Sequence, residues 1–163
     1  MTSQPAGIGF TIRPYRSADF DRLWQIDQAC FPAGIAYTQM ELSGFITRRN
    51  AITLVGEFQF TASSLDSLIA GFVVAHPIRR KYGRILTLDI LAQARRSGLA
   101  TQLMNACEER LRALGCAEVY LETAVDNEPA LRLYRKLGYE VLRTLPEYYA
   151  SHSLDAFQMA KRL

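Results

Sequence analysis

Long apolar runs are absent from this sequence, and residues that bind metals or form disulfides are few. No segment approaches the roughly 20 apolar residues that a membrane-spanning helix needs, and Met1 to Gly9 lacks the basic stretch and apolar run of a secretory signal. The 163 residues include three cysteines and two histidines, and no cysteine pair has C-x-x-C spacing. We therefore expect no membrane span, no metal and a reducing, cytoplasmic compartment.

A strong excess of one charge is also missing, since 19 basic and 16 acidic side chains give a net charge of +3. A nucleic-acid module needs a continuous basic face with exposed aromatic platforms, and the aromatics here mostly follow the spacing of a buried core. We expect no nucleic-acid partner. Basic residues gather only locally, where they either hold a phosphorylated small molecule or form a solvated rim: Arg79, Arg80, Lys81 and Arg84, then Arg95 and Arg96.

Length and composition indicate one domain, because 163 residues with 49% apolar side chains can bury a single core. Residues 1–9 are predicted to form a flexible tail, and residues 10–163 a single domain. The expected order is β-α-α-β-β-β-α-β-α-β-β, an α/β or α+β sandwich around a mixed sheet, in which a helical crossover makes two strands parallel. Strands are expected at 10–15, 51–58, 68–75, 84–91, 117–123, 138–145 and 154–159, and helices at 17–30, 38–46, 98–114 and 127–137.

Local signals place the ends of several elements. Ser17 is predicted to cap the first helix, and Thr38 with Glu41 forms a capping-box pattern for the second. Gly115 stands where a helix C-terminal cap belongs. Residues 61–67 are predicted to be a loop and residues 77–83 a turn.

The most informative segment is 90–101, where a strand ends and a helix opens with small residues. The free N–H groups and positive dipole end of a helix start form an anion site. Gly98 and Ala100 let a phosphate approach the backbone, and Arg95 and Arg96 add charge; alternatively, Gly98 only eases a tight turn. The segment matches neither G-x-x-x-x-G-K-S/T nor G-x-G-x-x-G, so a P-loop and a dinucleotide-binding Rossmann site are not expected.

Two further polar side chains are ambiguous by themselves. Tyr134 shares one helical face with Ala130 and Leu137 and so points toward the domain. A tyrosine in that position more often packs than reacts. Glu122 lies in an otherwise apolar strand and fits either a site or a solvated face.

Two motifs together resemble the signatures of the GNAT superfamily of N-acetyltransferases. Arg-x-x-Gly-x-Ala at 95–100, after a strand, is similar to the acetyl-CoA-binding motif. Asn-x-x-Ala-x-x-Leu-Tyr-x-x-x-Gly-Tyr at 127–139 is similar to the second signature. The similarity extends to 12–14, 30–32 and 155–159, and so covers nearly the whole chain. It is nearest to the ribosomal-protein-alanine N-acetyltransferases and related N-terminal acetyltransferases.

The resemblance implies the GNAT fold, a mixed, mostly antiparallel central sheet of about seven strands with helices on both faces and a splayed parallel pair at its centre. Acetyl-CoA would be the cosubstrate, with its pantetheine arm between the splayed strands. Asn127 would contact this arm and Tyr134 would lie beside the thioester sulfur. The remaining cofactor-binding residues would be Leu88, Asp89 and Ile90 for the arm, and Arg95, Arg96, Ser97, Gly98, Leu99, Ala100 and Thr101 for the pyrophosphate.

The resemblance also implies acid–base chemistry at Glu122 and Tyr134. Attack on a thioester needs a neutral amine, so Glu122 would accept a proton, directly or through a water. Tyr134 would return a proton to the departing thiolate, while a backbone N–H near Ile90 would steady the oxyanion. An α-amine, with a pKa of about 8, needs less help than a lysine at about 10.4.

The acceptor is the part of the reaction that the sequence determines least. Tyr37, Tyr148 and Tyr149 would hold a peptide N-terminus on the acceptor side. Tyr37 replaces a tryptophan that is usual after Cys-Phe-Pro in these enzymes, and Arg143 is unusually far from the tyrosine pair. Because both departures fall on the acceptor side, the resemblance is weakest there.

Two alternatives remain open. A small-amine transferase would act on a polyamine, amino acid or aminoglycoside and would use acceptor-side carboxylates, for which Glu41, Glu147 and Asp155 are candidates. A non-catalytic acyl-CoA-binding module would keep the fold without the chemistry. The oligomeric state, monomer or homodimer, does not follow from the sequence.

Overall fold

The computed structural model describes residues 9–58 and 68–163 and contains one seven-stranded sheet. Its strands run in the order β1-β2-β3-β4-β5-β7-β6. Neighbours are antiparallel except β4 and β5, which are parallel, so the expected mixed sheet is confirmed. The strands are β1 (Phe10–Pro14), β2 (Ile52–Phe58), β3 (Ile69–Arg79), β4 (Tyr82–Ile90), β5 (Glu118–Ala124), β6 (Glu140–Tyr149) and β7 (Leu154–Arg162).

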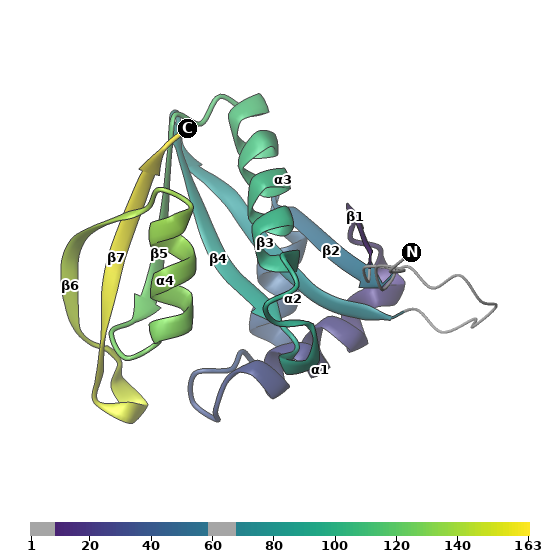
Figure 1. Cartoon of the computed structure of the whole chain (residues 1–163), viewed down its shortest axis with the longest axis horizontal. Helices are drawn as coiled ribbons and strands as arrows, with labels where there is room; N and C mark the ends of the chain where they lie inside the picture. The colour runs from purple at the N-terminus through teal and green to yellow at the C-terminus, as the bar shows by residue number, and fades with distance from the viewer. Residues whose placement is uncertain (1–8, 59–67) are drawn as a thin grey trace, which may run out of the picture.

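Helices cover both faces of the sheet, as expected (Figure 1). On one face lie α1 (Phe20–Cys30) and α2 (Gln39–Thr47), and on the other α3 (Leu99–Ala113) and α4 (Glu128–Lys136). Each face has its own buried core. The sheet therefore separates an α1/α2 side from an α3/α4 side. The direction of a strand side chain decides which of the two cores it joins.

Most of the expected helix ends are confirmed. Thr38 and Glu41 form the capping box of α2. Gly115, with φ of 91°, follows α3, and the next amide, of Cys116, donates to the carbonyl of Leu111 at 3.0 Å. The prediction for Ser17 is wrong. Ser17 begins a short 3₁₀ turn, where the side chain of Asp19 accepts from the backbone N–H of Arg16 at 2.8 Å.

The turn expected at 77–83 is present but shorter, at Arg80 and Lys81, because β3 and β4 continue into the predicted region as a hairpin and Pro77 pairs with Gly83. Proline is tolerated there because β2 pairs with β3 no further than Ala75, so the missing N–H of Pro77 costs no ladder bond. The predictions for the tail at 1–8 and the loop at 61–67 lie outside the described residues.

A bulge in β4 changes which side of the sheet its residues face. Val74 pairs with Thr87, whereas the next residue, Ala75, pairs with Ile85, so Leu86 has no partner on β3. The bulge adds one residue and resets the alternation of side chains. Ile85 packs in the α3/α4 core. After the bulge, the side chains of Thr87 and Asp89 face the α1/α2 side.

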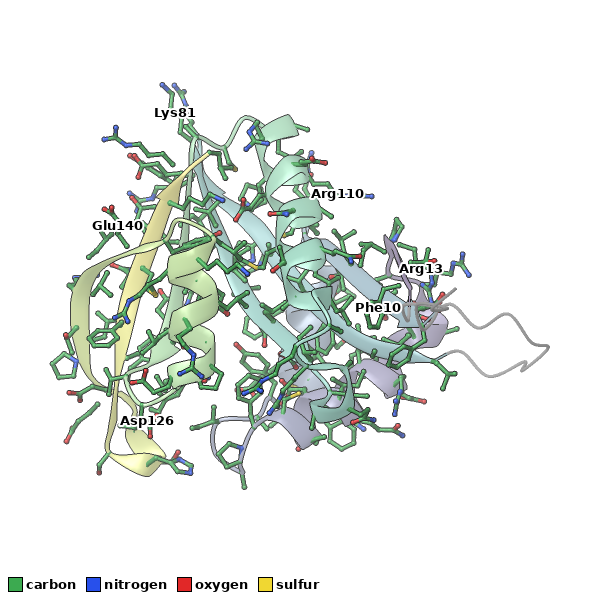
Figure 2. All side chains as sticks on the ribbon, viewed as in Figure 1. Phe10, Arg13, Lys81, Arg110, Asp126 and Glu140 are labelled. Atoms are coloured by element: carbon green, nitrogen blue, oxygen red, sulfur yellow. The ribbon has the colours of Figure 1, made fainter. Side chains whose placement is uncertain are left out.

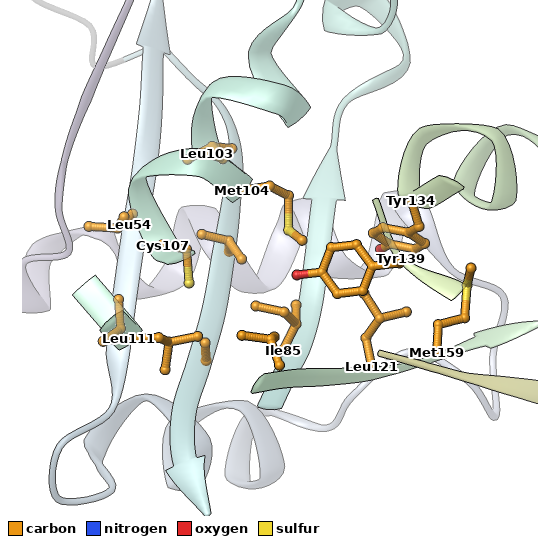
Figure 3. Close-up of a cluster of buried hydrophobic side chains, with 14 of the residues drawn as sticks. Leu54, Ile85, Leu103, Met104, Cys107, Leu111, Leu121, Tyr134, Tyr139 and Met159 are labelled. Atoms are coloured by element: carbon orange, nitrogen blue, oxygen red, sulfur yellow. The ribbon is translucent and has the colours of Figure 1, made fainter. Parts of the chain in front are cut away.

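The α3/α4 core is a cluster of apolar side chains that includes Tyr139 (Figure 3), whose hydroxyl belongs to a buried polar network. The Tyr139 hydroxyl donates to Oε1 of Glu108 at 2.9 Å, and Nζ of Lys161 donates to Oε2 at 2.8 Å. Glu108 is 4% exposed and Tyr139 is 2% exposed. The network therefore ties α3 to the residue that precedes β6 and to β7.

Replacing Glu108 with Ala should lower the free energy of unfolding by about 3 kcal/mol, because it leaves a buried hydroxyl and an ammonium group without their acceptor. Urea denaturation of both proteins measures the difference. The matched control is Glu109→Ala, the exposed neighbour on α3, which should cost under about 0.5 kcal/mol. Similar losses in the two variants would contradict a structural role for the network.

Candidate active site

The two parallel strands pair only at one end. Residues 82–84 of β4 pair with 118–120 of β5, and no further pairs follow. Beyond that point, β4 stays paired with β3 as far as Ile90, and β5 with β7 as far as Ala124. The strands therefore separate inside an otherwise continuous sheet (Figure 1), from the paired end near Lys81 to the open end near Asp126 (Figure 2).

A cavity of about 430 Å³ lies in this gap. Both separated strands, the segment after α1, and α4 line it. Tyr134, Asn127 and Leu88 are among its lining residues, so three of the expected cofactor-binding residues meet here. The expected gap at the centre of the sheet is therefore present and hollow.

The start of α3 has the features of an anion site. Gly98 is the N-cap, with φ of 85°, and a Cβ there would meet nothing within 4 Å. The amides of Ala100 and Thr101 have no partner within the helix. The Ser97 hydroxyl donates to the carbonyl of Ala94, which shapes the turn into α3.

The other residues expected to bind the cofactor near the start of α3 are either exposed or fully buried. Arg95 and Arg96 are exposed, and Nε of Arg95 donates to the carbonyl of Ile90 at 3.3 Å, across the end of β4. The Leu99 side chain is 1% exposed and belongs to the core, so only its backbone can meet a ligand. Asp89 is also 1% exposed and its side chain faces α1. Only the backbone of Asp89 can therefore contact a ligand in the cavity.

Tyr134 and Asn127 approach the cavity from α4. Tyr134 is 8% exposed, and its ring meets that of Tyr139 edge-on at 5.8 Å. Burial, with smaller contributions from Asp89 and Tyr149, raises the pKa of the Tyr134 phenol, which therefore stays protonated near neutral pH. The Asn127 side-chain oxygen caps α4 by accepting from the Ala130 amide at 3.3 Å, so its NH₂ group remains for a ligand.

Glu122 lines the cavity beside an arginine that the sequence analysis assigned to a basic cluster. Nε of Arg84 lies 3.2 Å from Oε2 of Glu122, and Nη2 donates to the Tyr148 hydroxyl at 3.1 Å. Arg84 forms the last residue pair between β4 and β5, with Tyr120. Its place in the site follows from that register, which the sequence does not reveal; Arg79, Arg80 and Lys81 stay exposed.

The three expected acceptor-side tyrosines lie around a second cavity of about 410 Å³, which shares Tyr37, Glu122 and Tyr149 with the first. The Tyr37 hydroxyl donates to the carbonyl of Leu86 at 3.2 Å. The rings of Tyr148 and Tyr149 meet edge-on at 5.0 Å, and burial raises the pKa of Tyr149 to about 12. Glu122 thus lies where the first cavity, expected to hold the donor, joins the second, expected to hold the acceptor.

Other site types find little support in the described part of the chain. Residues 9–58 and 68–163 bring together no group of three or more histidine, cysteine, aspartate or glutamate side chains that could hold a metal. Within the same residues, no helix combines the length and the apolar character needed to cross a membrane. Cys30, Cys107 and Cys116 are all free thiols.

Comparison with known proteins agrees with this geometry. The sequence profile of the acetyltransferase (GNAT) family matches residues 20–139. An N-alpha-acetyltransferase of Sulfurisphaera tokodaii is 28% identical over 169 residues, which cover 96% of this chain and 95% of that protein.

Solved structures share the fold. Ard1 from Thermoplasma volcanium superposes with a TM-score of 0.79 at 26% identity, over 94% of this chain and 97% of that one. NAA60 from Arabidopsis thaliana superposes with a TM-score of 0.82 at 22% identity, over 95% of this chain and 99% of that one. Since the family profile spans most of the chain, and the sheet carries the splayed parallel pair, the chain belongs to the acetyltransferase (GNAT) family.

Proposed function

We propose that this protein transfers the acetyl group of acetyl-CoA to the α-amine of a protein N-terminus. The observation that carries the proposal is the junction at Glu122, where the cavity between the separated strands opens into one lined by three tyrosines. The N-alpha-acetyltransferase that matches 96% of the chain supports the same acceptor. The three free cysteines support a reducing compartment such as the cytoplasm.

The residues present fit acetyl-CoA, which supplies the reactive acetyl thioester when bound. Free amides at the start of α3, with Arg95 and Arg96 beside them, suit a pyrophosphate. The inner edges of β4 and β5 offer unpaired backbone groups to an amide-rich arm. The free NH₂ of Asn127 adds a donor at the same cavity.

The acid and base are assigned by their surroundings. Glu122 accepts a proton from the attacking amine as the new C–N bond forms, and Tyr134 gives its proton to sulfur as the C–S bond breaks. The products are an amide and a free thiol, and the proton on Glu122 passes through water to restore Tyr134. The Glu122 oxygen that acts is Oε1, since Oε2 is paired with Arg84.

The alternative acceptors have less support. Of the three carboxylates considered for a polyamine pocket, Glu41 lines the acceptor cavity, whereas Glu147 and Asp155 line neither cavity. Arg84 adds a positive charge in the same place, which disfavours a polycation. A purely binding module has no need of an acid and a base at the junction.

A panel of peptides, each with a free α-amine and an internal lysine, tests the acceptor class by mass spectrometry after incubation with acetyl-CoA. We expect the acetyl group on the α-amine alone, because the α-amine is more often neutral than lysine near pH 7. Peptides blocked at the N-terminus are the controls and should stay unmodified. Acetylation of spermidine in a parallel reaction, with every peptide untouched, would instead establish a small-amine transferase.

Removal of either proton-transfer group should slow turnover. Glu122→Gln and Tyr134→Phe should each lower kcat by about 10²–10⁴-fold, with little change in the dissociation constant for acetyl-CoA measured by calorimetry. Tyr120→Phe is the matched control, since the Tyr120 hydroxyl bonds Glu118 and does not line either cavity. Near-normal turnover in both site variants would refute the acid–base assignment.

The anion site at α3 can be tested by charge. Ala100→Glu places a carboxylate among the free amides, where it stabilises the helix but repels the phosphates of the cofactor. We expect the KM for acetyl-CoA to rise about tenfold or more, while the melting temperature does not fall. Ala100→Gln, equal in size and uncharged, is the control, and an equal loss of affinity in both variants would indicate crowding rather than charge.

A further inference from the structure

Two aspartates that the proposed reaction does not use lie buried together next to Tyr37. Asp27 of α1 is 0% exposed, and Asp89 of β4 is 1% exposed. The bulge at Leu86 turns Asp89 toward α1. The two carboxyl groups lie within hydrogen-bonding reach of each other, so they form one unit that connects a helix with the cofactor-facing strand.

Each carboxyl group has one oxygen with a donor and one without. Oδ2 of Asp27 accepts from the backbone N–H of Tyr37 at 2.8 Å and from Nε2 of Gln28 at 3.3 Å, and Oδ1 of Asp89 accepts from the Thr87 hydroxyl. The other two oxygens, Oδ1 of Asp27 and Oδ2 of Asp89, are buried without a partner. Two ionised carboxylates can only accept hydrogen bonds, whereas a single proton between them gives both free oxygens a partner.

The groups of the described residues that are coupled electrostatically to the pair carry no positive charge, although the exposed Arg95 interacts with one of them, Cys30. The titratable groups of the described residues that are coupled electrostatically to the pair come from four places: Cys30 on α1, Tyr37 before α2, Glu41 on α2 and Tyr134 on α4. None of them is a cation. Burial accordingly raises the pKa of both Asp27 and Asp89.

We propose that Asp27 and Asp89 share one proton, and that this shared proton positions Tyr37 on the acceptor side of the reaction. Tyr37 is held at three points, of which the Asp27 bond is one. Its hydroxyl donates to the Leu86 carbonyl at 3.2 Å, and its carbonyl accepts from Nε1 of Trp24 at 3.2 Å and from Nε2 of Gln28 at 2.8 Å. The positioning role rests on the proposed function, in which Tyr37 lines the acceptor cavity. The existence of the shared proton is independent of the proposed function.

Loss of the shared proton has a defined consequence. Two negative charges would then face each other in a buried space, and α1 would move away from β4 and carry the amide contact of Tyr37 with it. We expect the KM for the acceptor to rise at alkaline pH, while the affinity for acetyl-CoA changes little. The side chains of Asp27 and Asp89 act as positioning groups in this scheme and contact neither substrate; only the backbone of Asp89 is expected to meet the cofactor.

The same proton makes stability depend on pH. Unfolded aspartates lose their protons near pH 3.9, whereas the folded pair keeps one. Above about pH 5 the folded protein therefore holds one proton more than the unfolded chain, and the folding equilibrium constant falls about tenfold per pH unit from this pair. The fall ends once the pH exceeds the raised pKa of the pair.

Asp89→Asn removes the shared proton but keeps a hydrogen bond between the side chains at positions 27 and 89. An asparagine NH₂ donates to Asp27 and its carbonyl accepts from Thr87, but it has no proton to lose. We expect the infrared carbonyl band of a buried carboxylic acid at neutral pH to disappear, and the pH slope of stability above pH 5 to flatten by about one proton. Asp21→Asn, an exposed position on α1, should leave both unchanged.

Positioning is measured separately. Hydrogen exchange of the Tyr37 amide should accelerate at alkaline pH in the wild type beyond the intrinsic increase, and not in Asp89→Asn; the alkaline rise in acceptor KM should vanish in the same variant. Absence of the infrared band in the wild type, or equal pH slopes in the two proteins, would overturn the shared proton. Equal amide exchange would overturn the positioning role.

These readouts distinguish the two proposals, because the band, the stability slope and amide exchange need no acceptor. If all three behave as expected and no peptide is acetylated, the acceptor assignment fails and the shared proton stands. Should Asp89→Asn not fold, Asp27→Asn serves in its place, since its NH₂ can donate to Asp89 while its carbonyl accepts from Tyr37. A retained band in that variant would count against the proposal.

Discussion

The separation of β4 from β5 is the constraint on which the rest of the site depends. Each strand keeps its outer partner, β3 or β7, so the gap interrupts the sheet without loosening it. The inner edges are left with backbone donors and acceptors that face a cavity rather than each other. Since buried backbone groups need partners, this gap suits a ligand rich in amides, and the free amides of α3 lie at its open end.

The bulge at Leu86 distributes the residues of β4 between two tasks. Before it, Arg84 is directed to Glu122 and Tyr148. After it, Leu88 lines the donor cavity while Asp89 turns to the opposite side and meets Asp27. The carbonyl of Leu86 itself receives the hydroxyl of Tyr37. One inserted residue thus lets a single strand contact the proposed donor side, the proposed acceptor side and α1.

Sequence patterns predicted those parts of the structure that depend on neighbouring residues. The capping box at Thr38 and the glycine cap at Gly115 were found because their signals are local. The turn predicted at 77–83 is shorter in the structure, at Arg80 and Lys81, because β2 pairs with β3 no further than Ala75, and β3 can therefore continue through Pro77. Arg84 and the Asp27–Asp89 pair could not be predicted, because strand register and a bulge bring them to their partners.

The environments of the two proposed catalytic groups also bear on which amine they can serve. Burial keeps the Tyr134 phenol protonated and thus available as an acid, while the ion pair with Arg84 leaves Glu122 one free oxygen, Oε1, to receive a proton. The two groups thus lie in different environments, which suits one of them to act as the acid and the other as the base. An α-amine is substantially neutral near pH 8, whereas a lysine is almost wholly charged there. A site whose proposed base is already paired with an arginine is therefore better matched to an acceptor that arrives nearly deprotonated, which is the chemical reason to favour a protein N-terminus over a lysine side chain.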